Sequence, residues 1–260
     1  MVWKVLDSTF FLFVCIKILF TILLLVDLVR YVVTIKERLV MKKAPFVVIE
    51  GIDGCGKTSA VKAIAKRYPN IHVTREPGGT LLAERIRSFL LSEKGAILSP
   101  EEQMTMFFAA RQIHLAEVIE VKRGAGIPVV TDRFDGSTFA FQKCLNIENG
   151  LVVGDSKLFD EFFLLRDHVV VPYAPTLYIY MNVDPEEGMR RRALDRDQDM
   201  NHFDLASIKE QQRRSASYER FFSVVCHSGG SRVVTIDANL HKHQVIQLVL
   251  ATIHDELARD

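Results

Sequence analysis

Cysteines are few in this sequence, and their spacing does not match a metal site or a set of disulfides. The 260 residues contain four, Cys15, Cys55, Cys144 and Cys226, with no CxxC pair and no histidine cluster at ligand spacing. Neither a structural zinc site nor a disulfide framework is therefore indicated, and a reducing compartment fits. An excess of one charge is also lacking, because the formal net charge is +1, so no nucleic-acid partner is predicted.

Internal repeats and low-complexity linkers are also lacking. With 48% hydrophobic residues, the chain can bury one substantial core. Five strand-like apolar runs alternate with helical stretches, which is typical of a parallel sheet with crossover helices. The runs are Phe46 to Glu50, Ile71 to Thr74, Pro128 to Thr131, Thr176 to Val183 and Arg232 to Asp237. We therefore predict one α/β domain with a parallel sheet of about five strands flanked by helices.

The longest helix is predicted to begin after Ser99, where a serine cap is followed by Pro100 and by Glu102, which completes a capping box. It should run to about Arg123, just before a glycine. Further helix starts are predicted at Asp155, at Asp184-Pro185 and at Asp204, and turn-rich stretches near Asn146 to Gly154 and His227 to Gly230.

A glycine-rich segment directly follows the first apolar run, and its residues are Gly51-Ile52-Asp53-Gly54-Cys55-Gly56-Lys57-Thr58. It matches the Walker A pattern between a strand and a helix, which is the context that the pattern requires. The glycines let backbone N–H groups curl around a polyphosphate, Lys57 reaches the outer phosphates, and Thr58 can ligate magnesium. We therefore predict that all eight residues bind a nucleoside triphosphate. Cys55 is either a small residue that fits the loop or a thiol whose pKa the helix N-terminus lowers.

The first forty residues differ in composition from the rest. Phe10 to Val29 is almost wholly apolar, with Lys17 and Asp27 as its charged residues, and is long enough to span a bilayer. Basic residues follow it, at Arg30, Lys36, Arg38, Lys42 and Lys43, which would leave the rest of the chain in the cytosol. Against an anchor, Lys17 is costly at mid-membrane depth, and Met41 begins a stretch that resembles the start of a chain.

Three interpretations of residues 1–40 stay open: a non-native or misassigned extension, a membrane anchor or targeting segment, and a helix packed on the domain. We therefore divide the chain into an apolar extension, residues 1–40, and a P-loop domain, residues 41–260. The expected location is cytoplasmic, with membrane association only through residues 1–40.

Charged residues follow the next two predicted strands, at the sheet edge where the P-loop also lies. Arg75, in Thr74-Arg75-Glu76-Pro77-Gly78-Gly79-Thr80, faces the ligand crevice and could hold a second phosphate. After the third run, Asp132 can hold magnesium through water and Arg133 can neutralise a phosphate during its transfer. Taken singly, the charged residues of either segment, Arg75 with its neighbours or Asp132 with Arg133, could equally form a structural ion pair.

Phe107 and Arg111 are spaced four residues apart on the predicted long helix, so they share one face. The ring could stack on a base and the guanidinium could bond its edge, whereas the alternative for such a phenylalanine is a place in the core.

Together these segments resemble the bacterial-type thymidylate kinases, which are P-loop nucleoside monophosphate kinases. Four segments carry the resemblance in family order: the P-loop with Asp53 inside it, residues 75–80, residues 107–111, and the run from Asp132 to Gln142. The resemblance extends from about Ala44 to the C-terminus. It implies a P-loop NTPase-type fold with a mobile lid.

The resemblance also implies how dTMP binds. Phe107 would stack on thymine, while Arg111 and Gln142 would bond its polar edge. Arg133 with Asp53 would organise the acceptor phosphate. Phe141 would close on the deoxyribose and leave no room for a 2′-hydroxyl. Arg75 and Ser137 complete the implied substrate site.

The lid is where this chain departs most from the resembled family, because the arginine-rich run 190–196 has an altered spacing. Some family members carry an arginine inside the P-loop, where this chain has Gly54. The resemblance therefore implies that a lid arginine neutralises the transferred phosphate, and Arg192 and Arg196 are the candidates. The alternative is a solvated helix face with Asp195 and Asp197 as partners.

The predicted function is ATP-dependent conversion of dTMP to dTDP, with Mg²⁺ held by Thr58 and Asp132 and with lid closure as a gate. A kinase for another deoxynucleoside monophosphate or a deoxynucleoside is the enzymatic alternative. A GTP-binding switch is the non-enzymatic alternative, although the chain lacks the Asn-Lys-x-Asp motif that binds guanine. A catalytically weak, membrane-tethered relative that functions through interaction is a third alternative. The resemblance also implies a homodimer, for which the apolar surface of the helix from Phe107 to Val121 is a candidate interface.

Overall fold

The computed structural model describes residues 43–148, 151–194, 203, 206–227 and 230–259. Its centre is a parallel sheet in the order β2-β3-β1-β6-β7. The strands are β1 (Phe46–Glu50), β2 (His72–Arg75), β3 (Val129–Asp132), β6 (Leu177–Asn182) and β7 (Arg232–Asp237). The predicted parallel five-stranded sheet is therefore confirmed. β1 is buried along its whole length and lies in the middle of the sheet, which explains why its sequence is a continuous apolar run.

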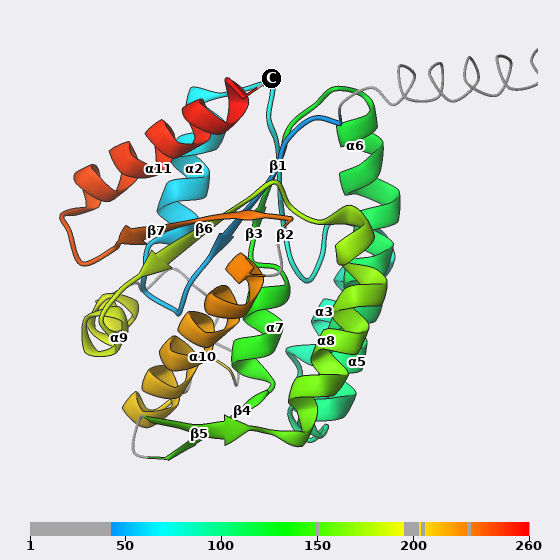
Figure 1. Ribbon diagram of the computed structural model, residues 1–260, viewed down its shortest axis with the longest axis vertical. Coiled ribbons are helices and arrows are strands. Elements are labelled where there is room, and N and C mark those ends of the chain that lie inside the picture. Colours follow the sequence, from blue (N-terminus) through cyan, green and yellow to red (C-terminus); the bar gives the residue numbers. More distant parts are fainter. Residues whose placement is uncertain (1–42, 149–150, 195–202, 204–205, 228–229, 260) are drawn as a thin grey trace, which may run out of the picture. The chain divides into compact units, whose positions relative to one another are not determined.

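Helices cover both faces of this sheet (Figure 1). α2 (Lys57–Arg67) and α11 (Lys242–Leu257) pack together on one face, while α7 (Asp135–Phe141) and α10 (Ile208–His227) pack together on the other. The remaining α-helices are α3 (Leu81–Leu90), α4 (Glu93–Ala96), α5 (Pro100–His114), α6 (Glu120–Gly124), α8 (Lys157–Val169) and α9 (Pro185–Leu194). Val171–Tyr173 form a short 3₁₀ turn.

The predicted long helix is present, but one stretch of it is not α-helical. The Ser99 hydroxyl accepts the amide of Glu102 at 3.2 Å, and the Glu102 carboxylate accepts the amide of Ser99 at 2.7 Å, so the capping box is confirmed. α5 continues without a break through a π-helical stretch, Leu115–Ile119, into α6, which ends at Gly124.

Two local predictions need correction. The stretch from Asn146 to Gly154 is not simply turn-rich, because β4 (Leu145–Glu148) and β5 (Leu151–Asp155) pair there as an antiparallel hairpin. An Asn-Gly pair between apolar runs, here at 149–150, is in fact a hairpin signal. The helix expected at Asp155 is α8, whose cap is Ser156.

Some predictions about the organisation of the chain fall on residues that the structure does not describe. The helix start at Asp204 is one, and described α10 begins at Ile208, where the Ser207 hydroxyl accepts the Glu210 amide at 3.3 Å. The apolar run from Phe10 to Val29 is another. In the described part of the chain, no helix has the length and apolar character needed to cross a bilayer.

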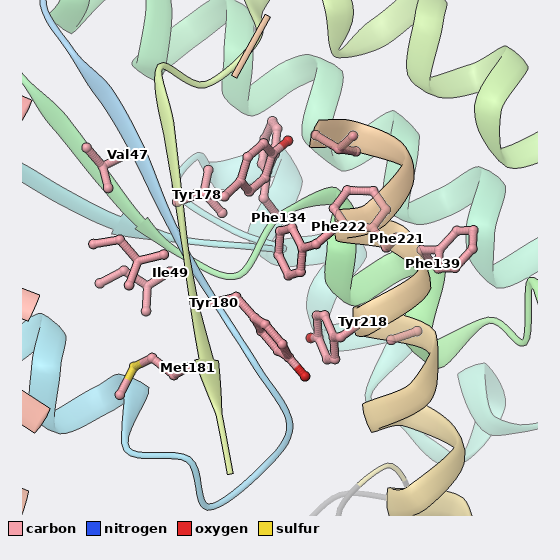
Figure 2. Packing of buried hydrophobic residues seen from close by; sticks show 14 of the residues in the cluster. Val47, Ile49, Phe134, Phe139, Tyr178, Tyr180, Met181, Tyr218, Phe221 and Phe222 are labelled. Atoms are coloured by element: carbon pink, nitrogen blue, oxygen red, sulfur yellow. The ribbon is translucent and has the colours of Figure 1, made fainter. Parts of the chain in front are cut away.

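An aromatic cluster fixes α7 and α10 to the sheet (Figure 2). The rings of Tyr180 on β6 and Tyr218 on α10 stack with centroids 5.7 Å apart. Phe139 on α7 is fully buried and contacts Phe221 of α10 with centroids 5.7 Å apart. Because protein interiors are closely packed, these contacts hold the backbones of α7 and α10 in fixed positions behind the site.

Candidate active site

A cavity of about 1970 Å³ lies at the carboxyl edge of the sheet. The register aligns the strand ends there, because Asp132 pairs with both Ile49 of β1 and Arg75 of β2. Most predicted site residues line this cavity: Asp53, Gly54, Cys55, Gly56, Lys57, Thr58, Arg75, Phe107, Arg111, Asp132, Arg133, Ser137, Phe141, Gln142 and Arg192. Gly51 and Ile52 lie at the base of the loop and are not on the cavity wall, and Arg196 lies outside the described residues.

The P-loop needs its glycines for both conformation and space. Gly54 has φ 79° and Gly56 has φ 100°, in the left-handed region. A Cβ atom at Gly54 would lie 1.9 Å from the carbonyl oxygen of Gly188 on α9. An arginine at this position would therefore collide with the backbone of α9, which excludes a P-loop arginine in this arrangement.

Lys57 lies over its own loop. Its ammonium donates to the carbonyl oxygens of Gly51 at 2.8 Å and Ile52 at 2.9 Å, and it lies 3.5 Å from the Cys55 sulfur. Cys55 is buried and packs in the core, as expected for a small residue that fits the loop. Lys57 is thus a buried cation at the N-terminus of α2. Phosphate oxygens could replace the two carbonyl oxygens as its hydrogen-bond acceptors.

Arg133 and Asp53 form an ion pair across the cavity floor. Arg133 has φ 69°, a rare conformation for a residue other than glycine. Its backbone amide donates to the carbonyl oxygen of Ile49 on β1 at 2.9 Å. Burial raises the pKa of Asp53, but the positive charges of Arg133, Lys57 and Arg214 outweigh it, so the pKa stays below its usual value. For Arg133 the effects have the opposite sign. Burial lowers its pKa, but the Asp53 carboxylate raises it by more, so the pKa of Arg133 lies above its usual value. Both groups are therefore charged at neutral pH.

Arg214 of α10 is a member of this cluster that the sequence analysis missed. One of its nitrogens, Nη1, lies 3.4 Å from Oδ2 of Asp53 and donates to the carbonyl oxygen of Phe203 at 3.1 Å. Its guanidinium carbon is 4.0 Å from the centre of the Phe141 ring. Burial lowers the pKa of Arg214 and the Asp53 carboxylate opposes the shift. No local pattern marks this arginine, because Asp53 is 161 residues away in the chain.

Glu50, the last residue of β1, holds the Arg133 loop in place and was also missed. Its carboxylate accepts the amides of Phe134 at 2.7 Å and Ser137 at 2.9 Å. The hydroxyls of Ser137 at 2.6 Å and Tyr218 at 3.1 Å donate to its other oxygen. Burial raises the pKa of Glu50, and Ser137 and Arg133 oppose the rise. Ser137, predicted to bind substrate, thus also orients the loop.

A second part of the cavity is lined by two buried polar side chains, Arg111 and Gln142. The guanidinium of Arg111 donates to the Glu76 carboxylate at 2.8 Å and to the Thr138 hydroxyl at 3.0 Å. Nη1 of Arg111 and Oε1 of Gln142 are buried and have no hydrogen-bond partner among the described residues. Phe107 is half-buried and lines the cavity, so the core alternative for it is wrong.

Phe203 adds a third ring to this part of the cavity. Its centroid is 6.4 Å from that of Phe107 and 5.8 Å from that of Phe141. The three rings therefore form one apolar, aromatic part of the cavity wall, and a planar base can stack on such a surface.

Arg75 and two arginines of α9, Arg190 and Arg191, have acidic partners. Arg75 lies 3.3 Å from Glu84 in an exposed ion pair, so a phosphate bound by Arg75 would share the guanidinium with this carboxylate. Arg191 pairs with Glu187 at 2.6 Å and donates to the carbonyl oxygen of Ala238 at 2.6 Å. Arg192 lines the cavity, whereas Asp195 and Asp197, its suggested partners, lie outside the described residues.

Thr58 and Asp132 fit a magnesium ion. Both line the cavity, and Oδ1 of Asp132 is buried without a hydrogen-bond partner in the described residues. Hydroxyl, carboxylate, phosphate and water oxygens are the ligands that Mg²⁺ prefers. The described residues contain no group of three or more metal-binding acidic, histidine or cysteine side chains, so phosphate and water oxygens would supply the other ligands.

Comparison with known proteins gives one consistent result. A family model described as thymidylate kinase matches residues 49–249. The thymidylate kinase of Halalkalibacterium halodurans is 32% identical over 222 residues, which are 84% of this chain and 100% of that protein. Those of Bacillus pumilus, 28% identical over 83% of this chain and 97% of that protein, and of Bacillus licheniformis, 30% identical over 81% and 93%, are similar as well.

Proposed function

The chain belongs to the thymidylate kinase family, and on that premise we propose that it transfers the γ-phosphoryl group of ATP to dTMP, forming dTDP and ADP. The single observation that best supports this acceptor is a pair of buried atoms without hydrogen-bond partners among the described residues, on two side chains that line the cavity. Nη1 of Arg111 is a donor and Oε1 of Gln142 is an acceptor. Thymine presents the complementary pair on its polar edge, the O4 acceptor and the N3–H donor.

Positioning and charge neutralisation account for the chemistry. The P-loop amides and Lys57 bind the ATP phosphates, while Arg133 holds the acceptor phosphate opposite them. The acceptor oxygen is already ionised, so no general base is needed. Mg²⁺, when bound by Thr58 and Asp132, would neutralise phosphate charge. Arg192 and Arg196 are the proposed lid arginines that close over the moving phosphoryl group.

Phe141 is the proposed sugar discriminator. The guanidinium carbons of Arg133 and Arg214 lie 5.2 Å and 4.0 Å from the centre of its ring. A ring held by these two contacts has little freedom to move aside for a 2′-hydroxyl, so it favours deoxyribose.

The test is ADP release with ATP and Mg²⁺ and with dTMP, dUMP, dCMP, dGMP, UMP or thymidine as acceptor. We expect turnover to be selective for dTMP. Equal or faster turnover with dCMP, dGMP or thymidine would favour the alternative kinases, and binding of nucleotide without turnover would favour a switch. We also propose that residues 41–260 form the kinase domain and that the enzyme is cytoplasmic. A chain beginning at Met41 should therefore match the full chain in this assay.

We further propose a homodimer. On the helix expected to form the interface, Phe108, Leu115 and Ile119 are buried within the subunit and are not available to a partner, whereas Val121 is 59% exposed. More strongly exposed apolar side chains lie on and after α3, where Leu81 is 76% exposed and Ile97 is 85% exposed, and we propose that they contribute to the interface.

Light scattering should therefore give twice the 29.6 kDa chain mass. Ile97→Glu should shift the protein toward monomer because a charge cannot be buried unpaired in an apolar interface. Leu248→Glu is the matched control, since Leu248 lies on α11 and is also exposed. A native protein that is monomeric at micromolar concentration would contradict the proposal.

A further inference from the structure

We propose that Gln103 is a positioning residue that makes the site discriminate thymine from cytosine, by fixing which atom of the Gln142 amide faces the base. The inference rests on the proposed function. Gln103 lies on α5, outside the cavity wall, and is 8% exposed.

Two backbone carbonyl groups fix the Gln103 amide. Nε2 of Gln103 donates to the carbonyl oxygen of Gly95 at 3.1 Å and lies 3.5 Å from that of Leu98. Carbonyl oxygens accept hydrogen bonds and do not donate them. If the Gln103 amide were reversed, its oxygen would face these two oxygens, so only one orientation is favourable.

The orientation of Gln103 then determines that of Gln142. Because the Gln103 nitrogen is committed to the carbonyl groups, its oxygen remains as the acceptor, and Nε2 of Gln142 donates to it at 3.3 Å. Gln142 is 1% exposed, so no solvent competes for this bond. Reversal of the Gln142 amide would place two oxygens against each other. Oε1 of Gln142 is therefore left as the atom without a hydrogen-bond partner among the described residues.

Arg111 is fixed in the same way, but by other groups. Glu76 and Thr138 occupy two of its nitrogens, and the rings of Phe108 and Phe134 each lie 4.9 Å from its guanidinium carbon. The pocket therefore presents a donor and an acceptor in a set order. Thymine and uracil match this order, whereas the N4–H₂ and N3 groups of cytosine oppose it at both atoms. The Gln103 contact controls the acceptor only.

The experiment compares the native enzyme with Gln103→Met, a residue of similar length that makes no such hydrogen bond. We expect kcat/KM for dTMP relative to dCMP to fall about tenfold, the value of one buried hydrogen bond. The ratio of dTMP to dUMP should not change, because both bases have the same polar edge. Where dCMP turnover is too slow to measure, its inhibition constant against dTMP replaces kcat/KM in the comparison.

Two further variants separate orientation from a loss of packing. Gln103→Glu would bury a carboxyl group against the carbonyl oxygens of Gly95 and Leu98, which favours its protonated form. That form donates to a carbonyl oxygen and keeps an acceptor for Gln142, so this variant should retain most of the native discrimination. In a Gln142→Met background, Gln103→Met should have no additional effect on the dTMP to dCMP ratio. Equal losses with all three nucleotides, or an unchanged dTMP to dCMP ratio, would overturn the role of Gln103. Absence of dTMP turnover in the native enzyme would instead overturn the proposed function.

Discussion

Replacement of Arg133 by alanine is expected to lower kcat/KM for dTMP by about 10³-fold, or about 4 kcal/mol of transition-state stabilisation. Arg133 carries its charge at the end of β3, with its nitrogens bonded to Asp53 and, at 3.2 Å, to Ser137. An acceptor phosphate placed there would be held in line with the ATP phosphates. Without the guanidinium, Asp53 would lose one of its positive partners, keep Arg214 at 3.4 Å, and repel that phosphate more strongly. Initial rates at saturating ATP with varied dTMP measure the effect.

Arg133→Lys should recover only part of this loss, because an ammonium keeps the charge but not the planar pair of donors. Arg220→Ala is the matched control, since Arg220 is a half-exposed arginine of α10 that lies 3.9 Å from Asp155, away from the cavity wall. It should leave the rate within a factor of about two, and retained thermal stability of Arg133→Ala would show that the fold is intact. An Arg133→Ala enzyme with near-native kcat/KM would remove Arg133 from the acceptor-phosphate site.

The sequence predicts the parts of the site that depend on contiguous residues. The P-loop conformation, for example, follows from glycines at 51, 54 and 56, because a polyphosphate loop needs positive φ values at set positions. The ends of the predicted strands also placed Arg75, Asp132 and Arg133 at one edge, since parallel strands share the direction of their carboxyl ends.

The missed residues act through contacts between segments that are distant in the chain. Glu50 contacts Tyr218 across 168 residues, and Gln103 contacts Gln142 across 39. A buried glutamine within an amphipathic helix has no local pattern that separates it from a surface glutamine. Only packing of α5 against its neighbours shows that Gln103 is buried and which groups meet its amide. The exclusion of an arginine at Gly54 likewise depends on the backbone of α9.

Lys57→Ala is expected to lower kcat by about 10³-fold and to weaken ATP binding, and it is the most direct test of the phosphate site. Lys57 is buried at the start of α2, where its charge contributes to the lowered pKa of Asp53. Alanine has the higher helix propensity and fills no new space, so α2 should stay folded. The alanine variant would leave the P-loop amides in place but remove the only side-chain cation of the loop itself.

Calorimetric titration with an ATP analogue, together with initial rates, separates the two effects. Lys66→Ala is the matched control, because Lys66 is an exposed lysine on the same helix and is not on the cavity wall. It should change neither the binding constant nor kcat. If Lys57→Ala, like the control, kept the native kcat and the native affinity for the ATP analogue, the ammonium group of Lys57 would play no part in phosphate binding. Loss of kcat with unchanged affinity would mean that Lys57 acts on the transition state alone, because only an interaction absent from the ground state leaves binding unaffected.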